Sequence, residues 1–153
     1  NQLAWKLRQD SRVINMEKQN IRTVTVEQIG ELVDFISIDV AFISLDKVLP
    51  VATNLLKDTG SLVALIKPQF EAGKENVGKG GIVRDSEIHK EVLHRILHVA
   101  YDCGLYTHGL TFSPIKGMEG NIEFLGYFKK YEEGALTIDD TLIDTVVAEA
   151  HSL

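Results

Sequence analysis

Short apolar runs alternate with stretches of helical periodicity along most of this chain, and the alternation restricts the folds open to it. Helical stretches over residues 45–57 and 85–102 separate apolar runs at 34–38, 61–66 and 105–112. Strands that alternate with helices in this way pair in parallel, and the helices then cover both faces of the sheet. The run 61–66 is almost entirely apolar, which predicts a strand buried on both faces.

The two ends of the chain extend this pattern. Residues 2–9 predict a short helix, and residues 12–16 predict a short strand after it. Residues 105–112 and 122–130 predict two strands joined by a short loop with proline and glycine, and such a pair is antiparallel. Residues 138–151 predict a last helix. We therefore expect an α/β fold whose sheet is mostly parallel, with an antiparallel C-terminal hairpin and helices on both faces.

Length and charge bound the organisation of the chain and its partners. The 153 residues are the size of one domain, which we place over residues 1–153. The net charge of −6, from 22 acidic residues against 16 lysines and arginines, argues against a module that binds nucleic acid by itself. No apolar run approaches the ~20 residues that span a membrane, and the single cysteine, Cys103, suits a reducing, cytoplasmic environment. The chain starts at Asn1 rather than at a methionine, so we expect this domain to be incomplete.

Four charged residues stand where the predicted strands meet one edge of the sheet. Glu17, Asp39 and Lys67 each directly follow a predicted parallel strand. Glu123 lies at the start of the last strand, which is antiparallel and therefore begins at the same edge. Because ligands of open α/β sheets bind at the carboxyl ends of the strands, we expect the four residues to converge on a ligand site. Any single one of them could instead be the solvated start of a loop.

Asp39 is the most informative of the four. It stands between two apolar runs, where a carboxylate is either partly buried with a partner or functional, and Lys67 on the next strand is the candidate partner. A lysine flanked by carboxylates keeps its charge and polarises a hydroxyl group, whereas a desolvated lysine can act as a base. Glu17 is placed to accept hydrogen bonds from ribose hydroxyls, as an acidic residue after the second strand does in nucleotide-binding sheets.

The stretch 67–84, which we call the flap, has 18 residues, four glycines and little periodicity. Loops of this length inside a domain are usually functional. Its segment GKENVGKG nearly matches the phosphate-binding loop of nucleoside triphosphatases, but Gly80 replaces the Ser or Thr that binds magnesium. The flap holds four cations and two anions, so its net charge is +2. We expect it to bind a phosphate-bearing substrate through Lys74, Lys79 and Arg84.

Long stretches of the sequence resemble one protein family. They are DVAFISL, LIKPQFEAGKENVGKGGIVRD and SPIKGMEGNIEFL at residues 39–45, 65–85 and 113–125, together with residues 1–22. They resemble the haemolysin A (TlyA) family of FtsJ-like, S-adenosylmethionine-dependent RNA 2′-O-methyltransferases. The resemblance implies a Rossmann-like methyltransferase fold, S-adenosyl-L-methionine as the cofactor, and ribosomal RNA or ribosomal subunits as the partner. From the sequence itself we expect neither a metal nor a membrane as a partner.

The resemblance also implies roles for individual residues. Three members of a Lys-Asp-Lys-Glu catalytic tetrad map to Asp39, Lys67 and Glu123. The residues that would hold the cofactor are Glu17, Asn20, Asp39 and Phe42. The first lysine of the tetrad, the first strand with its glycine-rich cofactor loop, and an S4-like RNA-binding domain would lie upstream of Asn1. The expected reaction is methylation of ribose 2′-hydroxyls in ribosomal RNA.

Two other functions stay open. The name of the family implies a membrane-lytic protein. Against that, the last predicted helix has an acidic polar face, which disfavours anionic lipid and consists of Asp139, Asp140, Asp144 and Glu149. The third possibility is a non-catalytic, RNA-binding scaffold that keeps the methyltransferase fold.

Overall fold

The computed structural model describes residues 3–152 of the chain. Its elements are, in chain order, α1 (Trp5–Arg8), η1 (Ile21–Thr23), α2 (Val26–Ile29), β1 (Val33–Ile38), α3 (Leu45–Leu55), β2 (Leu56–Ile66), α4 (Pro68–Glu71), η2 (Lys74–Asn76), α5 (Ser86–Asp102), β3 (Tyr106–Phe112), η3 (Met118–Gly120), β4 (Phe124–Lys129) and α6 (Asp140–His151). Every helix and strand that the sequence predicts from residue 34 onward is present, although β2 begins earlier than predicted, directly after α3.

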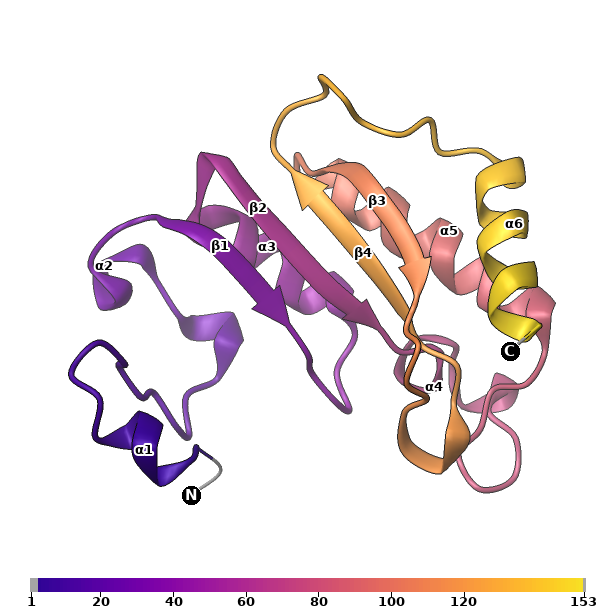
Figure 1. Ribbon diagram of the computed structural model, residues 1–153, viewed down its shortest axis with the longest axis horizontal. Coiled ribbons are helices and arrows are strands. Elements are labelled where there is room, and N and C mark those ends of the chain that lie inside the picture. Colours follow the sequence, from indigo (N-terminus) through magenta and orange to yellow (C-terminus); the bar gives the residue numbers. More distant parts are fainter. Residues whose placement is uncertain (1–2, 153) are drawn as a thin grey trace.

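The sheet is mixed rather than mostly parallel. Its four strands lie in the order β1-β2-β4-β3 (Figure 1), and only β1 and β2 run parallel. Strand β4 pairs antiparallel with both β2 and β3. The prediction of a mostly parallel sheet is wrong because the hairpin inserts β4 between β2 and β3. Strand β4 thereby takes part in two of the three strand pairs, and both of these pairs are antiparallel. The antiparallel C-terminal hairpin itself is confirmed.

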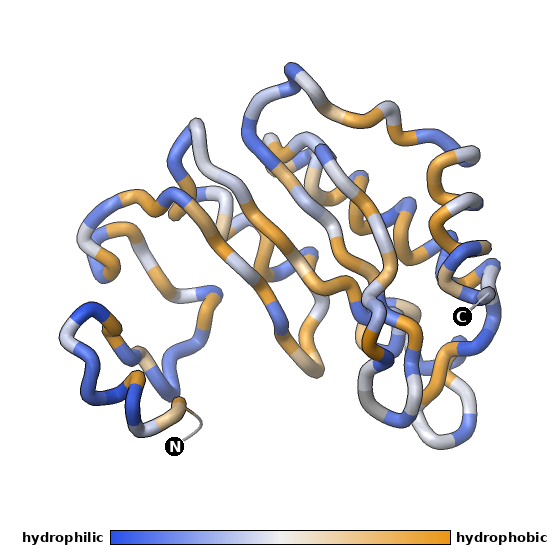
Figure 2. Tube along the Cα trace, viewed as in Figure 1, coloured by the Kyte–Doolittle hydropathy of each residue, from blue (hydrophilic) through white to orange (hydrophobic). Residues whose placement is uncertain are grey.

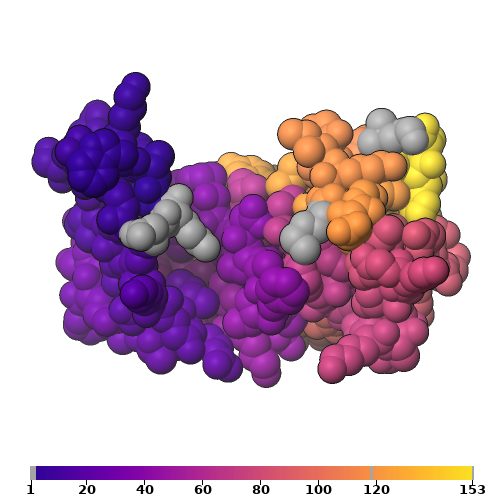
Figure 3. Space-filling model, turned by 90° about the horizontal axis from the view of Figure 1, so that it is seen from below, coloured from indigo at the N-terminus to yellow at the C-terminus, as the bar shows by residue number. Residues whose placement is uncertain are grey.

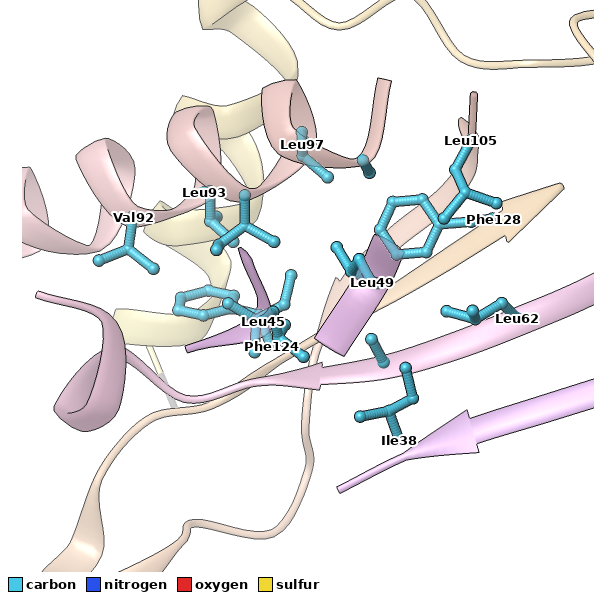
Figure 4. Packing of buried hydrophobic residues seen from close by; sticks show 14 of the residues in the cluster. Ile38, Leu45, Leu49, Leu62, Val92, Leu93, Leu97, Leu105, Phe124 and Phe128 are labelled. Atoms are coloured by element: carbon cyan, nitrogen blue, oxygen red, sulfur yellow. The ribbon is translucent and has the colours of Figure 1, made fainter. Parts of the chain in front are cut away.

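The helices α3 and α5, which pack on the sheet, lie on one face of it, behind the strands in Figure 1. Figure 4 shows side chains from both helices meeting the strand residues Ile38, Leu62 and Phe128. Burial alternates along β2 from Gly60 to Ile66, where the residues on the helix side are fully buried and those between them only half-buried. Within residues 3–152 no helix crosses the opposite face in Figure 1. The predictions of helices on both faces, and of a strand buried on both faces, are therefore wrong for this part of the chain.

Capping side chains determine where the two packing helices begin. The Ser44 side chain accepts a hydrogen bond from the backbone N–H of Asp46 at the start of α3. Asp85 does the same for the N–H of Glu87 at the start of α5. Gly104, with φ of +88°, follows the end of α5 and lets the chain turn away. Each helix then buries one apolar stripe, which contributes roughly 25 cal/mol per Å² of apolar surface removed from water.

The segment before β1 departs most from the predictions. The predicted helix over 2–9 is limited to α1, and its residue 2 lies outside the described residues. Residues 12–16 form no strand, and Ile14 is 81% exposed. A strand needs a neighbour for its ladder of hydrogen bonds, and within residues 3–152 no strand lies beside this segment. Figure 2 shows that this part of the chain is mostly hydrophilic, in contrast to the strands of the sheet.

Candidate active site

Asp39 and Lys67 meet at the carboxyl ends of β1 and β2. The two strands are parallel and end at Ile38 and Ile66, so the residues that follow them lie at one edge. The Nζ atom of Lys67 is 2.5 Å from Oδ1 of Asp39. The lysine side chain is only 17% exposed, whereas the aspartate side chain is 68% exposed. The ion pair thus holds a largely desolvated cation at the rim of the sheet, and its ammonium group has further N–H donors for a second partner.

Glu123 reaches the same edge from the antiparallel strand β4. Phe124, the first residue of β4, pairs with Ile66, so that Glu123 lies level with Lys67. The glutamate is buried. Gln69, in the short helix α4 that begins directly after Lys67, donates an Nε2–H hydrogen bond to Oε2 of Glu123 over 2.8 Å. The structure therefore places all three predicted catalytic residues at one edge of the sheet.

An aromatic pair, of which Phe42 is exposed and Phe70 half-buried, lies beside this group. Phe42 is 82% exposed and has φ of +64°, a backbone conformation that bulky residues rarely adopt. Its ring centroid lies 4.8 Å from that of Phe70. Phe42 follows Asp39 in the loop after β1, and Phe70 follows Lys67 in α4, so one ring comes from each segment of the ion pair. Strained backbone of this kind clusters at functional sites, where the surrounding structure holds it in place.

The flap folds back on itself and is anchored at its far end by Asn121. The Asn121 side chain is buried, and its Oδ1 accepts a hydrogen bond from the backbone N–H of Val83 over 3.0 Å. Its Nδ2 donates to the carbonyl oxygen of Gly81 over 2.9 Å. Figure 3 views this edge of the molecule, where the flap lies beside the loop that precedes β4. The predicted substrate-binding side chains are all exposed, namely Lys74, Lys79 and Arg84.

Glu71 fastens the flap to the helical layer. Its side chain is only 2% exposed. Oε1 accepts hydrogen bonds from the Ser44 hydroxyl over 2.5 Å and from Nη2 of Arg95 over 2.7 Å. Oε2 accepts a hydrogen bond from the backbone N–H of Leu45 over 2.9 Å. One buried carboxylate thus joins α4, which directly follows Lys67, to the start of α3 and to α5.

Glu17 and Asn20 lie in the segment before β1. Because residues 12–16 form no strand, Glu17 is not at the end of a strand, and the strand geometry predicted for it is wrong. Its carboxylate pairs with Arg8 and accepts a hydrogen bond from Nδ2 of Asn15 over 2.6 Å. The Oδ1 atom of Asn20 accepts a hydrogen bond from the backbone N–H of Arg22 and caps η1.

An apolar cavity of about 480 Å³ lies between β1, α3 and the segment before β1. Asp39 lines it, together with apolar side chains such as Ile21, Val40 and Val48. The other predicted cofactor residues are not among those that line it. As for metals, residues 3–152 contain no group of three or more His, Cys, Asp or Glu side chains arranged to hold an ion.

Three residues that shape this edge were not predicted from the sequence. They are Gln69, Glu71 and Asn121, and each makes its main contacts with residues far away along the chain. Gln69, for example, is 54 residues from Glu123. Gln69 and Glu71 lie two and four residues beyond Lys67, and Asn121 lies two residues before Glu123. The signals that could have drawn attention to them are their proximity to the predicted catalytic residues and their place in the stretches 65–85 and 113–125 that resemble the family.

Comparison with known proteins gives a consistent family. The FtsJ-like methyltransferase family model matches residues 1–130. The chain is 48% identical to the rRNA methyltransferase candidate YqxC of Bacillus subtilis, over 99% of this chain and 55% of that protein. It is 42% identical to hemolysin A of Brachyspira hyodysenteriae, over 84% of this chain and 54% of that protein. It is 38% identical to the 16S/23S rRNA (cytidine-2′-O)-methyltransferase TlyA of Mycobacterium tuberculosis, over 89% of this chain and 51% of that protein.

Solved structures agree with the sequence relatives. A hemolysin candidate from Streptococcus thermophilus superposes with a TM-score of 0.90 at 50% identity, over 99% of this chain and 55% of that one. A second, from Lactococcus lactis, has a TM-score of 0.89 at 44% identity, over 99% of this chain and 72% of that one. This chain spans about half the length of the curated relatives it matches. The resemblance found in the sequence is confirmed, and the chain belongs to the FtsJ-like methyltransferase family.

Proposed function

We propose that the protein carrying this chain transfers a methyl group from S-adenosyl-L-methionine to ribose 2′-hydroxyls of ribosomal RNA. The observation that carries the proposal is the ion pair of Asp39 and Lys67, level with the buried carboxylate of Glu123, in a chain of the FtsJ-like family. The Mycobacterium tuberculosis relative is named for this reaction on cytidines of 16S and 23S ribosomal RNA. Family and geometry therefore support the same chemistry.

Lys67 acts on the ribose hydroxyl. Asp39 binds Nζ of Lys67 on one side, which leaves N–H donors of the ammonium group for the 2′-oxygen. Negative charge builds up on this oxygen as its proton passes to solvent water, and a preorganised cation in a largely buried place stabilises that charge. Glu123 lies level with Lys67 and holds the lysine in orientation. Positioning of the hydroxyl accounts for most of the remaining acceleration.

When bound, S-adenosyl-L-methionine supplies a methyl group on a positively charged sulfur. The described residues fit such a molecule because Asp39 places a carboxylate at an apolar cavity of about 480 Å³, and cofactor pockets are mostly apolar with few polar groups. Asn20 directly precedes the lining residue Ile21, and Phe42 follows Asp39 in the same loop. We retain both as contacts at the rim, and Glu17 as a contact for the ribose of the cofactor.

The flap supplies the contact to RNA. Its cations Lys74, Lys79 and Arg84 are exposed beside the catalytic edge, and phosphate contacts of this kind fix a nucleic acid in register without reading its sequence. The chain as a whole carries a net charge of −6, so the flap is a local basic surface on an acidic molecule. Phosphates of the substrate are therefore attracted to the edge that holds Lys67 and away from the rest of the surface.

The membrane-lytic alternative rests on the name of a relative. None of the helices within residues 3–152 is long and apolar enough to cross a bilayer. Dye-filled vesicles test this alternative directly, and we expect no leakage when the purified protein is added. Leakage at protein concentrations that give no methyl transfer would favour the lytic function.

Methyl transfer to isolated ribosomal subunits tests the proposed function. The protein, expressed from its complete reading frame, is incubated with S-adenosyl-L-methionine that carries a radioactive methyl group and with subunits from cells that lack its gene. We expect the label in ribosomal RNA and, after alkaline hydrolysis, in a dinucleotide, because a 2′-O-methyl group blocks cleavage of the adjacent phosphodiester. Label in mononucleotides would indicate base methylation, and unlabelled RNA would refute the proposal.

A further inference from the structure

The carboxylate of Glu123 is packed directly against Gly117. A Cβ atom built on Gly117 would stand less than 3.0 Å from Oε2, Cδ and Oε1 of Glu123, closer than real Cβ atoms approach other atoms. Gly117 is not among the glycines with a left-handed backbone, so any residue could adopt its conformation. A side chain at position 117 would therefore displace the carboxylate of Glu123 from the place it now occupies.

Gly117 cannot easily move away from this contact. Its backbone N–H donates to the carbonyl oxygen of Asn121 over 2.8 Å, and its own carbonyl oxygen accepts from the N–H of Gly120 over 3.0 Å. Asn121 is in turn fixed by its side-chain hydrogen bonds to Val83 and Gly81 of the flap. The turn 117–121 is thus closed on itself and tied to the flap, which makes it a rigid support.

Gln69 holds the carboxylate from the side of α4. Its Nε2 donates to Oε2 of Glu123 over 2.8 Å. The other end of the amide, Oε1, is buried and has no hydrogen-bond partner among the described residues. A buried acceptor without a partner is unfavourable in free energy. The amide is nevertheless oriented with its N–H donor towards the carboxylate of Glu123. Between them, Gly117 and Gln69 leave the Glu123 carboxylate little freedom of position.

We propose that Gly117 and Gln69 are positioning residues that together fix the carboxylate of Glu123 beside Lys67. The inference rests on the proposed function, because it explains how Glu123 acquires the position from which it orients the lysine. Gly117 limits how far the carboxylate extends, and Gln69 limits its rotation. Neither residue touches the reacting atoms.

A double-mutant cycle tests the role of Gly117. In Gly117→Ala the new methyl group pushes the carboxylate aside, and we expect kcat for RNA methylation to fall about a hundredfold, as for a displacement of about 1 Å. Cofactor affinity, measured by calorimetric titration, stays unchanged. Glu123→Asp shortens the side chain and withdraws it from position 117. In the Glu123→Asp background the same Gly117→Ala change should therefore lower kcat by less than about threefold. An equal loss in both backgrounds would show that the alanine merely disturbs the loop and would overturn the inference.

A spectroscopic measurement tests the same contact without activity. The side-chain amide signals of Gln69, in protein labelled with ¹⁵N-glutamine, should move towards the values of a free amide in Glu123→Ala and in Gly117→Ala. Ile115→Ala is the matched control, since Ile115 lies in the same loop and is 76% exposed. It should leave the signals in place. If the amide signals of Gln69 do not change in Gly117→Ala, the inference is contradicted even if the protein methylates RNA.

Gln69→Leu covers the case in which Gly117→Ala fails to fold. The leucine keeps the approximate volume of the side chain but has no donor for Glu123, and we expect kcat to fall at least about tenfold with KM for the cofactor unchanged. A fall in thermal stability alone, with kcat preserved, would reduce Gln69 to a structural residue. If the wild-type protein methylates no RNA, the proposed function fails, and the amide signals alone then decide whether Gly117 and Gln69 hold Glu123.

Discussion

Lys67 and Asp39 form an ion pair whose partners differ in exposure, at 17% for the lysine side chain and 68% for the aspartate side chain. Another lysine, Lys57 of β2, pairs with Asp34 of β1 at the opposite end of the same two strands, over 2.9 Å. Its side chain is 45% exposed. The two pairs have the same chemistry, but only the pair at the carboxyl edge encloses its cation. This difference makes Lys57 a natural control for Lys67.

Replacement of Lys67 should abolish turnover. Lys67→Ala removes the cation that stabilises the ribose oxygen, and we expect methylation of ribosomal subunits to fall by at least about a hundredfold. Affinity for S-adenosyl-L-methionine, measured by calorimetric titration, should change little. Lys57→Ala should methylate at the wild-type rate. Full activity of Lys67→Ala would remove this residue from the proposed mechanism.

Flap cations should determine how RNA binding responds to salt. Each cation that binds a phosphate of single-stranded RNA releases counterions and adds about 0.7 to the magnitude of the slope of log K against log salt. Lys74→Gln combined with Lys79→Gln should therefore weaken binding and make this slope shallower. The matched control is Lys47→Gln combined with Lys57→Gln, which changes the net charge equally outside the flap. If both double variants have the same slope, the cations of the flap do not bind RNA phosphates in preference to cations elsewhere on the surface.

Glu71 should contribute to stability out of proportion to its charge. Glu71→Gln weakens the hydrogen bonds that a buried carboxylate accepts from Ser44, Leu45 and Arg95, and we expect a loss of roughly 2 kcal/mol in the free energy of unfolding. Urea denaturation measures this loss. Glu75→Gln removes an exposed carboxylate of the flap and should leave the unfolding midpoint unchanged. Equal midpoints for both variants would contradict the role assigned to Glu71.

Buried His89 should make the protein less stable in mild acid. Burial lowers the pKa of His89 below its ordinary value of 6.5. The hydrogen bond to the carbonyl oxygen of Val83 raises this pKa, and the neighbouring ring of His151 lowers it, but burial is the largest effect. Below about pH 6.5 the unfolded chain binds a proton that the folded protein does not, so stability is complete above this pH and falls as the pH decreases.

The expected decrease is at most about 1.4 kcal/mol per pH unit for this one group. Urea unfolding at pH 7.5 and pH 5.5 measures it. His89→Gln should show a smaller difference between the two pH values, and His98→Gln, at an exposed position of α5, should behave as the wild type does. An unchanged difference in His89→Gln would mean that other groups cause the loss.

Local sequence patterns predicted the four strands, the three long helices α3, α5 and α6, and the three residues proposed for catalysis. Helical periodicity and capping residues specify α3 and α5 because these preferences act within a few residues of the chain. Asp39, Lys67 and Glu123 were found by the same reasoning, since a residue directly beyond a strand end must lie at that edge of the sheet. Periodicity could not show that residues 12–16 remain without a strand, because a strand exists only where another strand is available to pair with it.

Tertiary structure alone decided the remaining features. The order β1-β2-β4-β3, and the helix layer on a single face, follow from which surfaces pack together. The contacts of Gln69 with Glu123 and of Asn121 with Val83 join residues that are 54 and 38 positions apart. Such contacts depend on the folded chain bringing distant segments together, and no local pattern records them. The sequence therefore determined which groups could carry the chemistry, and the fold decided which neighbours hold those groups in place.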